Sequence, residues 1–179
     1  MAMTTALVFT FIGVDKPGLV EMLSNTVSAH SGSWQQSRMT QLAGRFAGIT
    51  QVQVADDQLE ALQQALQALS GDDLTVIIQS GQTEPAPAPG QQVELSLIGN
   101  DRPGILMELS RALAARHINV SDMSTQVISA AMSADMLFEA TATIHLPPNQ
   151  DLAELSESLD DIANDLSVDI SLQPMNGPA

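Results

Sequence analysis

One seven-residue loop occurs twice in this chain, and the repeat limits what the chain can fold into. The first copy runs from Ile12 to Gly18 (IGVDKPG) and the second from Ile98 to Gly104 (IGNDRPG). A shift of 86 residues that aligns the two loops also aligns the apolar stretches before them and residues after them, such as Leu23 with Leu109. A register kept over this length indicates a duplicated unit, so the sequence predicts two domains of one design.

Each unit is predicted to contain the same succession of elements. In the first, apolar residues predict a strand over 6–12 with both faces largely covered, and the loop and a helix follow it. The rest of the unit is a strand over 33–42, a turn at Ala43-Gly44, a strand over 46–54, a helix from Asp56 and a strand over 74–78. This β-α-β-β-α-β order predicts the α+β class and a ferredoxin-like fold, with both helices on one side of an antiparallel sheet.

The first helix of each unit should begin directly after the repeated loop. Asp15 is well placed to cap that helix, and Pro17 suits its first turn, because an N–H group there would stay unpaired anyway. Apolar residues at helical spacing predict its core-facing stripe: Leu19, Val20, Met22, Leu23 and Val27. The helix of the second unit has a corresponding stripe: Ile105, Leu106, Leu109 and Leu113.

Composition indicates where the domains end. Residues 81–92 include the run EPAPAPG, which cannot pack a core and predicts an extended Pro/Ala linker. The first domain is therefore expected over 5–80 and the second over 93–173, with a disordered tail at 174–179.

The charge of the chain argues against a nucleic-acid surface. Six Lys and Arg residues stand against 21 Asp and Glu residues, which gives a formal charge of −15 and disfavours contact with a phosphate backbone. No apolar run approaches the roughly 20 residues that cross a bilayer, and the start of the chain lacks the basic segment of a signal peptide. We therefore expect a cytoplasmic protein that contacts neither DNA nor membrane.

The sequence contains no recognisable catalytic pattern. It has no cysteine, and its three histidines, His30, His117 and His145, stand at unrelated positions. No metal-ligand spacing and no phosphate-binding loop with a Gly-Lys-Ser/Thr end is present. We expect neither an enzyme nor a metal or cofactor site.

The repeated loop allows two interpretations. It can be purely structural, with a glycine that lets the strand turn, an aspartate cap and a proline at the helix start. It can also bind a ligand, because the free N–H groups of a helix N-terminus suit a carboxylate. Asp15 or Asp101, if not used in capping, could then hold an ammonium group, and the two together suit a free α-amino acid.

Taken together, the loop and element order resemble the ACT domain, a βαββαβ module that binds small effectors, commonly amino acids. The resemblance covers roughly residues 5–80 and 92–173. In that family, ligands often sit where the loop after the first strand meets the start of the second strand, at an interface with another ACT domain. The resemblance implies these ligand-binding residues in the second unit: Asn100, Asp101, Arg102, Pro103, Gly104, Ile105 and Asn119. In the first unit it implies Asp15, Lys16, Gly18, Leu19 and Ser33, where Ser33 replaces the amide of Asn119 and Trp34 follows it.

A narrower resemblance follows from the first hairpin, through Ser37-Arg38, Leu42 and Gly44-Arg45-Phe46. These residues are similar to those of tandem-ACT proteins of the glycine cleavage system transcriptional repressor family. That resemblance implies an amino-acid sensor, for glycine or serine, that acts through a DNA-binding regulator protein and forms a homodimer. Two alternatives remain open: a ligand-free platform for protein interaction, and a separate regulatory subunit of an amino-acid-metabolising enzyme.

Overall fold

The computed structural model describes residues 3–79, 90–130, 135–147 and 151–175. The chain divides into two compact units, residues 1–85 and 86–179.

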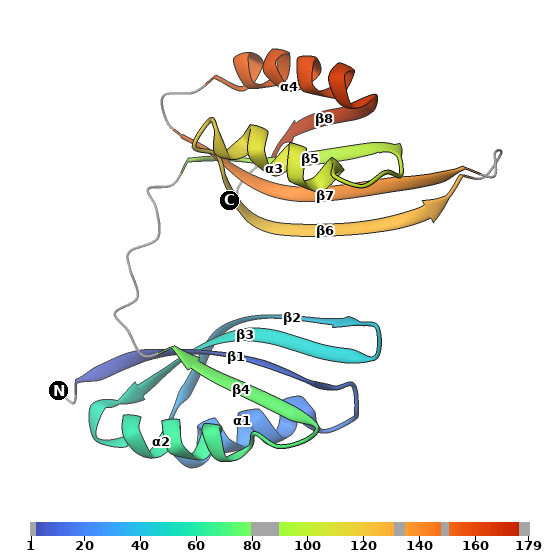
Figure 1. The fold of residues 1–179 in the computed structure, drawn as a ribbon. Coiled ribbons are helices and arrows are strands. Elements are labelled where there is room, and N and C mark those ends of the chain that lie inside the picture. The colour runs from blue at the N-terminus through green and yellow to red at the C-terminus, as the bar shows by residue number, and fades with distance from the viewer. Residues whose placement is uncertain (1–2, 80–89, 131–134, 148–150, 176–179) are drawn as a thin grey trace. The chain divides into compact units, whose positions relative to one another are not determined.

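The first unit is a four-stranded antiparallel sheet with both helices on one face (Figure 1). Its elements are β1 (Thr4–Val14), α1 (Leu19–Ala29), β2 (Ser33–Leu42), β3 (Arg45–Ala55), α2 (Asp56–Ala68) and β4 (Leu74–Gln79). The strands lie in the order β2-β3-β1-β4, so β1 is central and receives a neighbour on each side. The other face of the sheet carries no helix.

The second unit repeats this plan. Its elements are β5 (Gln91–Asn100), α3 (Ile105–Ala114), β6 (Asn119–Ser129), β7 (Met136–Leu146), α4 (Leu152–Leu166) and β8 (Val168–Pro174). The strand order β6-β7-β5-β8 matches that of the first unit, strand for strand. The predicted α+β class and the two ferredoxin-like units are confirmed.

The core of each unit lies between the sheet and its two helices. In β3 the predicted alternation holds, because Thr50, Val52 and Val54 are buried and the residues between them are not. On α2, Leu62 and Leu66 are fully buried at a spacing of four. Two separate clusters result, one within each unit, and neither includes a buried residue of the other unit.

Several apolar residues lie outside the cores that were predicted to contain them. Ile12 of β1 is 50% exposed, because the face of the sheet opposite the helices is open, so the prediction that both faces of this strand are covered is wrong. Val20 and Met22 of α1 and Leu106 of α3 are also exposed. Each helix buries only a narrow stripe at spacings of four, which for α1 consists of Leu19, Leu23 and Val27.

Two predicted boundaries also change. Gln91 and Gln92 belong to β5, where they pair with Leu146 and His145, so the linker ends earlier than residue 92. Pro174 pairs with Val93 in β8, and Met175 donates its backbone N–H to the carbonyl of Gln92, so neither begins a disordered tail. Pairing of β5 with β7 and β8 therefore extends the second sheet into both segments. The remainder of both predictions, residues 81–89 and 176–179, lies outside the described residues.

Candidate functional site: the repeated strand-to-helix loops

Both repeated loops end in a glycine with a left-handed backbone. Gly18 has a φ of 91° and Gly104 a φ of 98°, and each is the residue directly before its helix. A side chain at Gly18 would meet no atom within 4 Å, so the conformation and not the available space requires glycine there. The left-handed residue turns the chain sharply into α1 and α3.

Neither loop aspartate caps the helix that follows it. Among the described residues, no side chain accepts a hydrogen bond from the start of α1 or α3. Asp15 instead donates its backbone N–H to the Gly44 carbonyl at 3.1 Å, and Asp101 donates to the Met136 carbonyl at 2.8 Å. The predictions that Asp15 caps α1 and that Pro17 forms its first turn are wrong, because Gly18 determines where the helix starts. The carboxylates of Asp15 and Asp101 are exposed.

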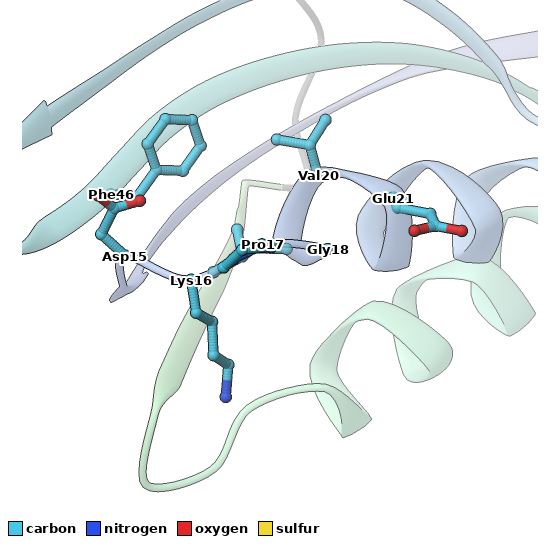
Figure 2. Close-up of a pocket in the computed structure, with 8 residues that line it drawn as sticks. Asp15, Lys16, Pro17, Gly18, Val20, Glu21 and Phe46 are labelled. Carbon is cyan, nitrogen blue, oxygen red and sulfur yellow. The ribbon is translucent and has the colours of Figure 1, made fainter.

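A hollow of about 510 Å³ adjoins the loop of the first unit. It is lined by residues 15–21 and Phe46, and therefore by four of the predicted site residues: Asp15, Lys16, Gly18 and Leu19. Figure 2 shows the Asp15 carboxylate beside the Phe46 ring, whereas the Lys16 side chain points away toward the segment that leads into β4. Lys16 Nζ lies 3.0 Å from Asp73 Oδ2 in that segment. The cation of this loop is thus held away from Asp15.

The cation of the second loop has a different partner. Arg102 Nη2 donates to Glu108 Oε2 at 2.7 Å, and Arg102 Nη1 lies 3.4 Å from Glu108 Oε1. The hydrogen bond from Arg102 lowers the pKa of Glu108, and the same bond raises the pKa of Arg102. Glu108 lies in the first turn of α3, so this pair ties the loop to the helix it precedes. Met22 stands at the corresponding position of the first unit.

The two predicted halves of each site lie at opposite ends of a sheet. Asp101 bonds Met136, the first residue of β7, whereas Asn119 pairs with His145 near the end of that strand. About nine residues at about 3.3 Å each separate those two positions, which gives a distance on the order of 30 Å. In the first unit, Asp15 bonds Gly44 and Ser33 pairs with Gln53, with the same separation along β3. Within one unit, therefore, no single amino acid can contact both halves.

The other predicted residues take varied positions. Leu19 and Ile105 are only 4% and 1% exposed, because their side chains belong to the cores. They could therefore contact a ligand only through their backbone N–H groups. Pro103 is exposed on the loop. Asn100 lines a different hollow of about 540 Å³, which it shares with Asn164 and Ser167 where α4 leads into β8.

Three residues that shape these loops were not among the predicted site residues: Phe46, Asp73 and Glu108. A signal for Phe46 was present, because the predicted turn at Ala43-Gly44 returns β3 to the loop end of β1. The opposite charges of Arg102 and Glu108 across a helix start were a second signal. Asp73 gave none, since its contact with Lys16 joins residues far apart in the sequence.

Other kinds of site find no support in the part of the chain that the structure describes. No group of three or more His, Asp or Glu side chains there could hold a metal ion. Within the same residues, no helix is long and apolar enough to cross a membrane.

Comparison with known proteins gives the family. Residues 5–79 and 91–173 each match the family model described as the ACT domain. The chain belongs to the ACT-domain family. Its two ACT domains cover both units, as the repeated loops predicted, and their βαββαβ order is the one described above.

Several known proteins are similar to this chain over almost its whole length. The glycine cleavage system transcriptional repressor of Escherichia coli (strain K12) is 20% identical over 171 residues, which cover 95% of this chain and 90% of that protein. A solved structure of an unknown protein from Galdieria sulphuraria has a TM-score of 0.84 at 24% identity and covers 97% of this chain and 100% of its own. A structure described as a candidate glycine cleavage system transcriptional repressor has a TM-score of 0.76 at 20% identity, over 98% of this chain and 100% of its own. The two structures establish a shared fold.

Proposed function

We propose that this tandem ACT-domain protein is a regulator that binds a free α-amino acid at its repeated loops and acts through a protein partner. The observation that carries the proposal is an exposed aspartate beside an uncapped helix N-terminus, in both units. The first-turn N–H groups suit the ligand carboxylate, and Asp15 or Asp101 suits its ammonium group. The helix N-terminus and the loop aspartate thus offer one group for each charge of a free amino acid.

In the proposed site, the second half comes from a neighbouring ACT domain of another copy. Asp101 and Asn119 lie at opposite ends of their sheet, so two domains placed antiparallel side by side would bring the Asp101 loop of one to Asn119 of the other. β6, which begins at Asn119, is an edge strand of its sheet and has one side available for such a neighbour. An amide at this position can both donate to the ligand carboxylate and accept from its ammonium group. This arrangement requires a homodimer.

Glycine and serine are the proposed ligands, and a DNA-binding regulator is the proposed partner. The name of the Escherichia coli relative connects that protein with glycine cleavage and with transcription. The formal charge of −15 disfavours direct contact of this chain with DNA, so control of transcription would need a partner that binds DNA itself. We accordingly propose that the protein works in the cytoplasm and has no catalytic role.

A thermal-shift screen with the common amino acids tests the ligand. A ligand at 100 times its dissociation constant adds about 2.7 kcal/mol to the free energy of unfolding, which is easily measured. Asp101→Ala should reduce the shift, whereas Asp160→Ala, which removes an exposed carboxylate on α4, should keep it. Absence of a shift with every amino acid would support a ligand-free platform instead.

Capture of partner proteins from the native host tests the proposal that the protein acts through a DNA-binding regulator. Recovery of a DNA-binding protein supports the proposal. Recovery of an amino-acid-metabolising enzyme in its place would identify the protein as a separate regulatory subunit and would overturn the transcriptional role.

A further inference from the structure

The face of the first sheet that carries no helix is apolar at its centre. Ile12 of β1, Ile49 of β3 and Ile77 of β4 are 50%, 48% and 56% exposed. Thr10 pairs with Ile49 on one side and with Ile77 on the other, so the two isoleucines flank it in one row across three strands. Ile12 follows Thr10 on the same face, because side chains alternate along a strand. These neighbours form one patch, which distinguishes them from single exposed apolar residues.

The same face is positively charged in a strongly acidic chain. The four strands β1 to β4 contain no Asp or Glu, although the chain has 21 such residues. They contain two arginines, Arg38 and Arg45. Arg38 pairs with Ile49, and Arg45 precedes Ile49 by an even number of residues on β3. Both side chains therefore lie on the open face, together with Ile49.

The open face of the second sheet has the opposite character. Each of its four strands carries one carboxylate and no Lys or Arg: Glu94, Asp122, Glu139 and Asp169. Glu94, Glu139 and Asp169 alternate with core residues and therefore lie on the face away from the helices. Asp122 follows a bulge in β6 and lies on the same face, because it pairs with Thr143, which stands between the core residues Ala142 and Ile144. Glu139 and Asp169 both pair with Ile98, and with it they line a hollow of about 310 Å³. Ile98 thus has the carboxylate of Glu139 on one side and that of Asp169 on the other.

We propose that the open face of the first sheet docks on the open face of the second sheet of another copy of this chain. Charge selects this pairing over the two self-pairings. First sheet on first sheet would gather four arginines with no carboxylate, and second on second would gather eight carboxylates. Only the crossed pairing covers Ile12, Ile49 and Ile77 and also sets Arg38 and Arg45 against carboxylates.

The area of the faces favours a reciprocal dimer. The four strands of the first sheet are 11, 10, 11 and 6 residues long and lie about 4.8 Å apart, which gives a face of roughly 600 Å². One such contact is smaller than the roughly 800 Å² per partner of a stable interface. A two-fold dimer makes the contact twice, which brings the area to about 1,200 Å² per chain. This contact uses sheet faces, whereas the proposed ligand site uses the loops and the start of β6, so substitutions on the sheet faces test the contact without changing a residue of the ligand site.

Charge reversal on one face at a time tests the contact. Arg38→Glu with Arg45→Glu, or Glu139→Lys with Asp169→Lys, should each raise the concentration at which the assembly dissociates at least tenfold in analytical ultracentrifugation. Arg111→Glu on α3 and Asp160→Lys on α4 change the net charge in the same directions, by half as much, away from the sheets, and they should leave that concentration unchanged. Circular dichroism checks folding, and the milder pair Arg38→Gln with Arg45→Gln should shift dissociation in the same direction.

Mixing the two reversed variants gives the decisive result. In a mixed dimer, one contact is the pairing of the unmodified protein and the other sets the two new glutamates against the two new lysines, so an equimolar mixture should assemble more tightly than either variant alone. A chain that carries all four reversals should likewise assemble more tightly than the variant with the two arginine reversals alone. Reversed variants that assemble like the controls, an unmodified protein that stays monomeric, or a mixture that does not recover would each overturn the proposal.

Discussion

Asp101 and Asn119 occupy opposite ends of the second sheet, one beside the start of β7 and the other beside its end. The separation, on the order of 30 Å, means that one domain alone cannot bring both residues to a single amino acid. Asp15 and Ser33 are separated in the same way in the first domain, so this separation is a property of the fold. The proposed ligand site therefore depends on a neighbouring domain.

The Arg102–Glu108 pair should give the stability of the second domain a dependence on pH in the acid range. The pKa of Glu108 is lowered in the folded state, so the pair stabilises the fold above the ordinary carboxyl pKa of about 4.3 and loses this effect as pH falls through the folded pKa. Glu108→Gln removes the effect. We expect the melting temperature of the unmodified protein to exceed that of the variant near pH 7, and the difference to shrink as the pH falls below the ordinary carboxyl pKa of about 4.3. A difference independent of pH would contradict this role.

Gly48 allows Phe11 to occupy the first core. A Cβ atom at Gly48 would lie 2.9 Å from a Phe11 ring carbon and 2.8 Å from Met39 Cγ. Gly48→Ala should therefore destabilise the protein by about 1 to 3 kcal/mol in urea unfolding. The paired residues at the equivalent place in the second unit are Leu97 and Ala140, so adding Phe11→Leu should recover part of the loss. Additive effects of the two substitutions would show that the ring is not the obstacle.

The first hairpin contains a strained alanine that can be improved. Ala43 and Gly44 form its two-residue turn with φ values of 50° and 74°, and a turn with two positive φ values prefers Asn-Gly. A left-handed conformation costs a residue with an ordinary side chain about 1 kcal/mol, and asparagine tolerates it better. Ala43→Asn should raise the melting temperature and Ala43→Val should lower it. Equal melting temperatures for the two variants would argue against the strain.

Periodicity was sufficient to predict most of the fold. The alternation of Thr50, Val52 and Val54 and the spacing of Leu62 and Leu66 follow from the geometry of strands and helices, and the structure keeps both. The open face of β1 was mispredicted, because Ile12 is apolar and periodicity cannot tell a core from a surface patch. The helix starts were mispredicted because Gly18 takes a left-handed conformation, which a Pro-Gly pair does not reveal.

The candidate site was harder to predict than the fold. The loops were found through their repetition, but Asp101 and Asn119 were joined by resemblance, without regard to the register of the hairpin. An antiparallel register fixes the start of β6 against the end of β7, so the separation was implicit in the predicted strands. Contacts such as that of Lys16 with Asp73 depend on how a distant turn packs, which no local pattern contains.

The most direct test of the account is calorimetric titration of glycine and serine into Asp101→Ala, Asn119→Ala and an equimolar mixture of the two. Each variant alone should lose binding at the second-domain loop. After the chains exchange, mixed dimers regain one intact site made of Asp101 from one chain and Asn119 from the other, so binding should return at roughly a quarter of the second-domain sites of the unmodified protein. A mixture as inactive as its components would contradict a site completed between copies, and undiminished binding by Asp101→Ala would contradict the loop aspartate as the group that holds the ligand.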